Sequence, residues 1–236
     1  MPLYRNSDAK PSGHGATPVG AVRVVSWNLL RRVGAELADV AALVRQQKPD
    51  LLLLQEVTEE IEGLPGLVGG HFHRDPMQKR IYGLAVWSPH PLPQPRVLRL
   101  PASTLPGRVP PRIAQIVQCH GITFVNVHLS HGQFLNRWQL LHITRRLKGP
   151  AAIIGDFNAV GPTRLPNFRD IGPREATHYP SNIVPLRLDR CLAQGLRCHA
   201  AQVLERGPSD HHPIVLELGL DTAGAGRRSA NVGLRA

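Results

Sequence analysis

Short apolar runs alternate with polar segments along the chain, and the spacing of the apolar residues separates strands from helices. Val22–Asn28 (VRVVSWN) is rich in β-branched residues and predicts a strand. Its alternation places Ser26 and Asn28 on one face and Trp27 on the other. Leu51–Gln55 is a short apolar strand of the kind that is buried on both faces.

The rest of the body shows the same two patterns. Further strands are predicted at Tyr82–Ser88, Ile113–Gln118, Ile122–Leu129, Ala151–Ile154, Leu186–Ala193 and Ile214–Leu218. Apolar residues at helical spacing predict helices over Gly34–Gln47 and Gln133–Leu147. We expect the second helix to bury Phe134, Trp138 and Leu141.

Mixed strands with a few helices predict an α/β fold in which two mixed β-sheets pack face to face, with the helices outside. One domain covers residues 21–218, without an internal repeat or a long linker. Residues 1–20 and 219–236 are rich in small and polar residues without a period, and we expect both segments to be disordered tails.

The composition limits the class of protein. Hydrophobic residues make up 42% of the 236 residues and charged residues 19%, as in globular domains. No apolar run approaches the roughly 20 residues of a membrane-spanning helix, and the N-terminal residues lack the order of a secretory signal. The three cysteines form no CxxC motif, so we expect reduced thiols and a cytoplasmic protein.

The net charge of +11 indicates a polyanionic partner, such as nucleic acid or an acidic lipid surface. An alternative explanation stays open. The basic residues are almost all arginine, and the chain is also rich in Ala, Gly and Pro. A GC-rich coding sequence produces this composition whatever the partner is.

Polar residues recur where the apolar strands finish. The set comprises Asn28, Glu56, His128, Asp156, Asn158, Asp189, Asp210 and His211. Each alone could begin a turn, start a helix or lie satisfied in the core. Together, four carboxylates at one rim of a sandwich would repel one another unless a cation joined them. Carboxylate and amide oxygens suit Mg²⁺ or Mn²⁺, and the two histidines can transfer protons, so the set indicates hydrolysis of a phosphate ester.

Eight short motifs stand out along the chain, and six of them contain these residues. They are Ser26-Trp27-Asn28, Leu54-Gln55-Glu56-Val57, Gly83–Pro91, Asn126-Val127-His128-Leu129, Arg137-Trp138-Gln139-Leu140, Gly155-Asp156-Phe157-Asn158, Leu188-Asp189-Arg190 and Ser209-Asp210-His211-His212-Pro213. In type and order they resemble the motifs of the endonuclease/exonuclease/phosphatase superfamily, also called DNase I-like. The resemblance covers about residues 21–218 and implies a four-layer α/β sandwich and a metal-dependent phosphoesterase.

The resemblance also implies the metal ligands. Glu56 corresponds to the principal Mg²⁺ ligand, and Asn28 and Asp210 are expected near the metal, directly or through water. Mn²⁺ is expected to be a possible substitute.

The remaining roles concern the substrate. Asp156 corresponds to the carboxylate that orients or deprotonates the attacking water, and Asn158 to a donor to a phosphate oxygen. His211 is expected to contact the scissile phosphate, and Asp189 to fix the His211 ring through its other nitrogen. Either Asp156 or the His211–Asp189 pair could be the base.

His128 distinguishes branches of the superfamily. Abasic-site endonucleases and exonuclease III have tyrosine at this position, whereas deoxyribonuclease and the sphingomyelinases have histidine. His128 is expected to be a general acid for the leaving alkoxide or a hydrogen-bond donor to phosphate. We expect His131 to make no direct contact with the metal or the phosphate, and His212 to face solvent or to be structural. Thr177 or Ser181 is expected to support the site.

Three functions are compatible with these features. We expect first a Mg²⁺-dependent phosphodiesterase that acts on nucleic acid, because the basic body supplies attraction independent of sequence. The alternative is hydrolysis of a phospholipid, an inositol phosphate or another small phosphoester, whose phosphates arginine binds equally well. The third is a non-catalytic binding protein with the same fold.

Overall fold

The computed structural model describes residues 20–31, 33–103, 111–179 and 184–221. The predicted tails, residues 1–20 and 219–236, therefore lie almost entirely outside the described residues, and Ser181 lies outside them too. Within the described part, no helix combines the length and the apolar character that crossing a bilayer requires.

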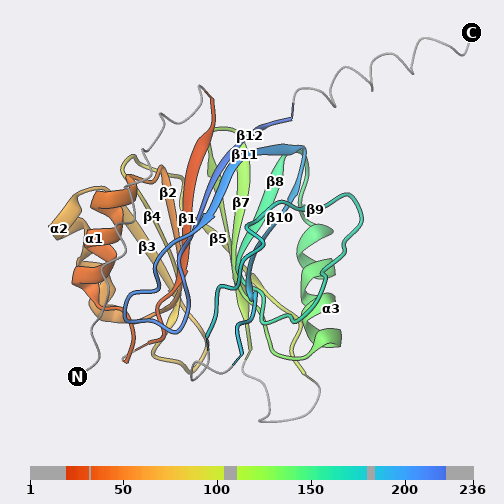
Figure 1. Ribbon diagram of the computed structural model, residues 1–236, viewed down its shortest axis with the longest axis horizontal. Helices are drawn as coiled ribbons and strands as arrows, with labels where there is room; N and C mark the ends of the chain where they lie inside the picture. Colours follow the sequence, from red (N-terminus) through yellow and green to blue (C-terminus); the bar gives the residue numbers. More distant parts are fainter. Residues whose placement is uncertain (1–19, 32, 104–110, 180–183, 222–236) are drawn as a thin grey trace, which may run out of the picture.

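Two six-stranded sheets pack face to face (Figure 1). The first has the order β11-β12-β1-β2-β4-β3, with bounds Leu196–Val203, Ile214–Leu220, Val22–Asn28, Leu51–Val57, Gly83–Ser88 and His71–Pro76. The second has the order β5-β6-β7-β8-β10-β9, with bounds Arg96–Arg99, Ile113–Cys119, Ile122–His128, Ala151–Asp156, Asp189–Gln194 and Arg169–Asp170. Each sheet is mixed, because β1–β2 and β7–β8 are parallel and their neighbours are antiparallel.

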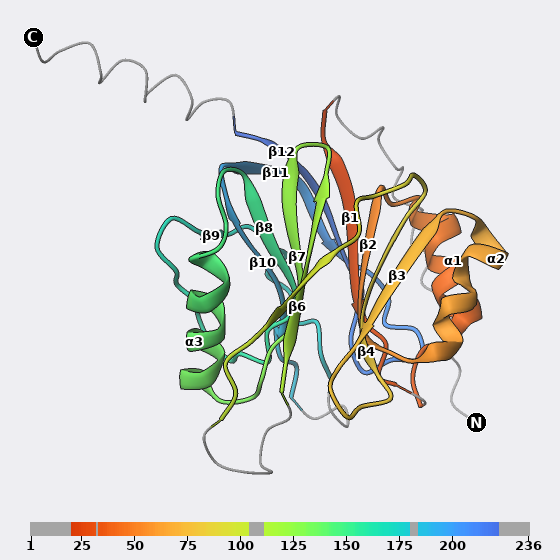
Figure 2. The ribbon, with the colours of Figure 1, turned by 180° about the vertical axis from the view of Figure 1, so that it is seen from behind.

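Helices cover the outer faces of both sheets (Figures 1 and 2). α1 (Leu37–Gln47), the 3₁₀ helix η1 (Glu59–Gly63) and α2 (Leu64–Val68) pack on the first sheet. α3 (Gln133–Thr144) packs on the second sheet. The order helix, sheet, sheet, helix confirms the expected four-layer α/β sandwich.

Most of the interface between the sheets is apolar. Val24, Leu53 and Phe124 are buried in the cluster between the two sheets. The residues next to them in the chain point outward instead, so that Leu54 packs toward α1 and Val125 toward α3. This alternation confirms the predicted faces of β1 and the burial of β2 on both sides.

At one end of this interface, amide side chains replace the apolar ones. Asn126 donates to the backbone carbonyl oxygens of Leu54 and Ala85, at 3.0 Å each. Gln55 donates to the side-chain oxygen of Asn126 at 2.8 Å. A buried amide without partners would destabilise the fold, so these bonds allow polar residues at this depth. They join the two sheets directly beside the strand ends that carry the predicted site.

α1 begins at Leu37, later than the predicted start at Gly34. The Asp39 carboxylate accepts a hydrogen bond from the Glu36 backbone N–H at 2.8 Å, which satisfies one of the free donors at the helix N-terminus. The predicted end at Gln47 is confirmed.

α3 shows that one prediction is wrong. Phe134 and Trp138, expected to be buried, expose 94% and 52% of their surface. The inner face carries Asn136 and Gln139 instead, together with apolar residues. Gln139 accepts a hydrogen bond from the backbone N–H of Ser130 at 3.0 Å. The spacing of the apolar residues predicted the wrong buried face, because the loops under α3 need amide side chains as hydrogen-bond partners for their backbone groups.

Candidate active site

Strand pairing brings three of the predicted residues together. The β7–β8 register sets His128 opposite Asp156, and the β8–β10 register sets Asp156 opposite Asp189. Asn28, at the end of β1 in the other sheet, donates from Nδ2 to Asp156 Oδ2 at 3.1 Å. These four residues therefore lie together at one rim of the sandwich.

Gly155 allows β8 to approach β7 closely just before this rim. Its φ of 136° favours glycine, and a Cβ atom at this position would lie 2.2 Å from the carbonyl oxygen of Val127. Any larger residue would therefore push apart the two strands that carry His128 and Asp156.

The Asp156 carboxylate is buried among hydrogen-bond donors. Oδ1 accepts from the Asn158 backbone N–H at 2.8 Å, and Oδ2 accepts from the Asn158 side chain at 3.2 Å. Burial raises the pKa of Asp156; the charge of His211 opposes this effect, that of Asp189 adds to it, and the net shift is upward. Asn158 also donates to the backbone carbonyl of Leu129 at 3.0 Å, so its side-chain N–H groups are engaged within the protein.

Glu56 reaches the rim through a β-bulge. The register of β2 against β4 shifts between Gln55 and Val57, and Glu56 itself has a φ of 56°. The Glu56 carboxylate contacts the Arg31 guanidinium at 2.9 Å. Because 47% of the Arg31 side chain is exposed, this ion pair is weak and a divalent cation can replace the arginine.

The loop that carries Asp210 and His211 is fixed to β1. Trp27 Nε1 donates to the His211 carbonyl oxygen at 2.9 Å. The Ser209 hydroxyl donates to the Asn28 carbonyl oxygen at 2.7 Å. The first sheet thus holds this loop against the strand ends of the second sheet.

The His211 ring lies between two carboxylates. Its Nδ1 is 2.8 Å from Asp189 Oδ2, and its Nε2 is 3.9 Å from Asp156 Oδ2. Burial by itself would lower the pKa of His211, but the charges of Asp189 and Asp156 outweigh burial and raise it to about 10. The ring is therefore an imidazolium near neutral pH.

His128 is buried between two other carboxylates. Its Nε2 lies 3.4 Å from Asp156 Oδ2 and 4.0 Å from Glu56 Oε1. Its Nδ1 has no hydrogen-bond partner among the described residues. Burial, and after it the charge of Arg112, holds the pKa of His128 well below its usual value. The ring is therefore neutral and can donate a hydrogen bond from one nitrogen.

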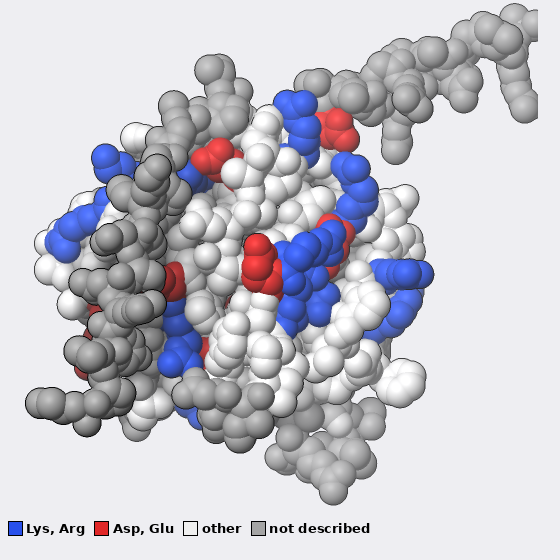
Figure 3. Space-filling model, viewed as in Figure 1, with Lys and Arg blue, Asp and Glu red and all other residues white. Residues whose placement is uncertain are grey.

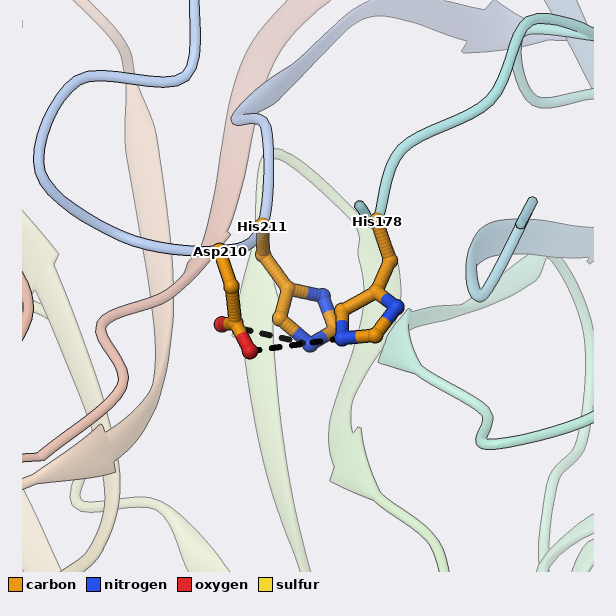
Figure 4. Close-up of side chains that lie close together, drawn as sticks. All are labelled: His178, Asp210 and His211. Atoms are coloured by element: carbon orange, nitrogen blue, oxygen red, sulfur yellow. Dashed lines mark ion pairs between the residues drawn. The ribbon is translucent and has the colours of Figure 1, made fainter. Parts of the chain in front are cut away.

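Thr177 and His178 come from the irregular segment between β9 and β10. The Thr177 hydroxyl oxygen accepts from the backbone N–H groups of Leu188 and Asp189, at 3.1 and 2.9 Å. Sequence reasoning missed His178, although it follows Thr177 directly. The His178 ring centroid lies 4.4 Å from that of His211, and its Nε2 is 3.3 Å from Asp210 Oδ2 (Figure 4).

A pocket of about 310 Å³ opens between these side chains. Seven of the predicted residues line it: Asn28, Glu56, His128, Asp156, Asn158, Asp210 and His211. Asp189 is fully buried behind the ring of His211. His131 also lines the pocket, together with His178. His212 instead places Nδ1 2.6 Å from the backbone oxygen of Leu204.

The donor atoms around the pocket fit a divalent cation. Glu56, Asn28 and Asp210 offer oxygen atoms to one pocket, and Asp210 Oδ1 is buried without a hydrogen-bond partner among the described residues. Oxygen donors of this kind suit Mg²⁺ or Mn²⁺. Asp210 also belongs to a second donor set, because its carboxylate, His178 and His211 offer ligand atoms within 4.8 Å of one another (Figure 4).

A sequence model of the endonuclease/exonuclease/phosphatase family matches residues 25–211, from β1 to the loop that carries His211. The chain belongs to this family. Members of the endonuclease/exonuclease/phosphatase family are hydrolases of phosphoester bonds. The match includes all eight predicted residues and confirms the resemblance that the motifs showed.

Individual proteins are similar to this chain over most of its length. The UPF0294 protein of Klebsiella pneumoniae (strain 342) is 26% identical over an alignment of 243 residues, gaps included, that covers 89% of this chain and 87% of that protein. An endonuclease/exonuclease/phosphatase from Beutenbergia cavernae has a TM-score of 0.67 and 20% identity, covering 85% of this chain and 72% of its own. A mannosyl-6-phosphatase from Bacteroides thetaiotaomicron has a TM-score of 0.65 and 18% identity, covering 84% and 99%. The two solved structures show the shared fold.

Proposed function

We propose that this protein is a Mg²⁺-dependent phosphodiesterase that hydrolyses phosphodiester bonds in nucleic acid. The observation that carries the proposal is the His211–Asp189 contact of 2.8 Å at the edge of a pocket that Glu56 also lines. A cationic imidazolium, buried carboxylates and oxygen donors for a cation together match the requirements of phosphate ester hydrolysis. The net charge of +11 favours a polyanionic substrate.

Glu56 would hold the Mg²⁺ ion, with Asn28 and Asp210 near it. When bound, the ion supplies positive charge that stabilises the phosphate oxygens and the attacking water. The neutral His128 donates a hydrogen bond to a phosphate oxygen or to the leaving oxygen. This role agrees with the lowered pKa of His128.

The other side of the pocket positions the phosphate. His211 donates from Nε2 to a phosphate oxygen, while Asp189 fixes its ring through Nδ1. Asn158 can donate to the phosphate only if it gives up one of its present bonds, to Leu129 or to Asp156. Asp156 is the first candidate for the base that takes the proton of the attacking water. The His211–Asp189 pair is the second candidate, but only in the molecules in which His211 is neutral, because the pKa of His211 is raised to about 10.

The test is an activity panel at increasing Mg²⁺ or Mn²⁺ concentration. The substrates are single- and double-stranded DNA, RNA, a phospholipid and inositol phosphates, and His211→Ala is the control variant. We expect cleavage of nucleic acid that disappears on metal chelation and in the variant. Intact nucleic acid together with cleavage of a lipid or a small ester would overturn the choice of substrate.

The same site could act on a phospholipid, an inositol phosphate or another small phosphoester. The similarity to a protein described as a mannosyl-6-phosphatase favours this second candidate. Hydrolysis of a soluble chromogenic phosphodiester without nuclease activity would support it. A non-catalytic binding role would require that Glu56→Gln, which removes the carboxylate charge, leaves the physiological function unchanged.

A further inference from the structure

A second pocket, of about 820 Å³, opens beside the candidate active site. It lies among the residues between β8 and β10, around β9. Val160 and Leu186 line both pockets, so the two adjoin at these residues. A substrate that extends from the active-site pocket on this side would enter the second pocket.

Arginine dominates the charge of this second pocket. Its charged lining residues are Arg164, Arg169, Arg174, Arg187, Arg190 and Asp170, and we call it the arginine pocket. Basic side chains also gather in the middle of the molecular face shown in Figure 3. Asp170 and Asp221, which pairs with Arg169 at 3.4 Å, offset two of these five guanidinium charges, so the described side chains leave an excess of three positive charges around the pocket. Such an excess attracts anions.

Three of these arginines share one counterion, the Asp170 carboxylate. Arg187 binds Asp170 through two hydrogen bonds of 2.7 Å, a geometry that holds the segment in place. Nitrogen atoms of Arg174 and Arg190 lie farther from the same carboxylate, at 3.5 and 3.6 Å. The Asp170–Arg187 pair thus accounts for the local structure, and it leaves the charges of Arg174 and Arg190 without a close counterion of their own among the described residues.

Arg190 provides the strongest evidence that the arginine pocket binds an anion. Its side chain is only 3% exposed, and its Nε has no hydrogen-bond partner among the described residues. Burial lowers the pKa of Arg190, and the charge of Arg187 lowers it further. A buried cation that is incompletely paired is costly, and an anion in the pocket that it lines would offset this cost.

We propose that the arginine pocket binds a phosphate group of the substrate that is not itself hydrolysed. This inference rests on the proposed function and narrows it. The preferred substrate would carry a second phosphate near the scissile one, as the neighbouring nucleotide in a DNA or RNA strand does. Guanidinium groups match phosphate oxygens in charge and in geometry, whereas a neutral sugar or an acyl chain gains little from them.

The exposed arginines allow a kinetic test that leaves the fold intact. The substrates are a thymidine dinucleotide with and without terminal phosphates at either end, and bis(p-nitrophenyl) phosphate, which has a single phosphate. We compare the wild type, Arg174→Gln and Arg164→Gln with the control Arg96→Gln, an exposed arginine on β5. Inositol phosphates with one and with two phosphates show whether a small ligand suffices in place of a strand.

We expect the wild type to prefer the dinucleotide with a terminal phosphate about tenfold in kcat/KM, the usual value of one charged hydrogen bond. Arg174→Gln should lose most of this preference and leave kcat/KM for bis(p-nitrophenyl) phosphate unchanged. Arg96→Gln should retain both. If the wild type shows no preference, or if all variants retain it equally, the proposal is wrong.

A binding test separates this inference from the proposed function. Inorganic pyrophosphate is titrated by calorimetry into metal-free His211→Ala protein, with and without Arg174→Gln. We expect Arg174→Gln to weaken pyrophosphate binding about fivefold or more. The slope of log affinity against log salt concentration should also fall, by about the amount that one phosphate contact contributes. Equal affinities would overturn the arginine pocket as a phosphate site. A protein that hydrolyses no phosphodiester but shows the Arg174 effect would overturn only the proposed function.

Discussion

The rim of strand ends and the arginine pocket adjoin, but the chain builds them in different ways. Backbone register places His128, Asp156 and Asp189 at the rim, on three adjacent strands. The arginine pocket lies around β9, a strand of only two residues, and a side-chain pair between Asp170 and Arg187 holds it together. Changes in the arginine pocket should therefore alter substrate preference without moving the rim, whereas changes at the rim should abolish the chemistry.

Two aspartates give the largest contrast. Asp156→Asn removes the carboxylate that faces His128 and His211, and we expect kcat for bis(p-nitrophenyl) phosphate to fall about 10³-fold. The matched control, Asp170→Asn, removes the carboxylate of the arginine pocket and should leave this kcat nearly unchanged. Steady-state kinetics with saturating Mg²⁺ and a thermal unfolding curve for each variant make the measurement.

Equal losses in the two variants, with both still folded, would show that the rim and the arginine pocket do not act independently. Asp156→Asn with most of its activity would exclude Asp156 as the base. The His211–Asp189 pair would then be the remaining candidate.

The second contrast lies within the rim, between His211, which lines the pocket, and Asp189, which is buried behind it. Asp189→Asn keeps the shape of the buried partner of His211 but not its charge, and we expect kcat to fall about 10²-fold with little change in KM. Because Asp189 helps to raise the pKa of His211, the alkaline limb of the pH–rate profile should move to lower pH in the variant. An unchanged profile would mean that Asp189 acts only through packing.

The sequence predicted the rim well because strand alternation and motif order both point to it. The inner face of β1, with Ser26 and Asn28, follows from the period of two alone. Glu56 could be predicted only from the family motif. In a regular strand its side chain would point to the face opposite Gln55, and the β-bulge that redirects it leaves no periodic signal in the sequence. His178 lies in a segment whose position depends on isolated hydrogen bonds, so no pattern placed it beside His211.

The arginine pocket and the face of α3 escaped prediction for a related physical reason. Arg187 and Asp170 are far apart in the chain and meet through side chains, which leave no periodic signal. In α3 the buried Asn136 and Gln139 satisfy the backbone of nearby loops, and this need depends on tertiary contacts. Hydrophobic patterning therefore predicts the inward-facing polar residues of this fold least well.

The charge of the rim makes a third prediction, for stability in metal-free protein. The pKa of His211 is raised to about 10 in the folded state, above its usual value of 6.5. The stabilisation from the imidazolium is therefore complete below about pH 6.5 and is lost as pH rises toward 10. Between pH 7 and 9 the wild type should lose about 2.5 kcal/mol of unfolding free energy relative to His211→Gln, which lacks this titration.

Urea unfolding of both proteins in EDTA at several pH values measures this difference. Taking the difference cancels the titration of groups that the two proteins share. A constant difference from pH 7 to 9 would mean that Asp189 and Asp156 do not hold His211 in its charged form.

The smallest effect belongs to Thr177, where the irregular segment supports the rim. Its hydroxyl oxygen accepts hydrogen bonds from two buried backbone N–H groups, those of Leu188 and Asp189. Thr177→Val keeps the shape but leaves both donors unpaired, so we expect a loss of about 1–2 kcal/mol in unfolding free energy and a lower kcat. Thr177→Ser keeps the oxygen and should retain most of the wild-type unfolding free energy and kcat. Equal losses in Thr177→Ser and Thr177→Val would assign the effect to the methyl group. Rescue by serine would show that the irregular segment acts on catalysis through one acceptor atom, which holds Asp189 where the His211 ring needs it.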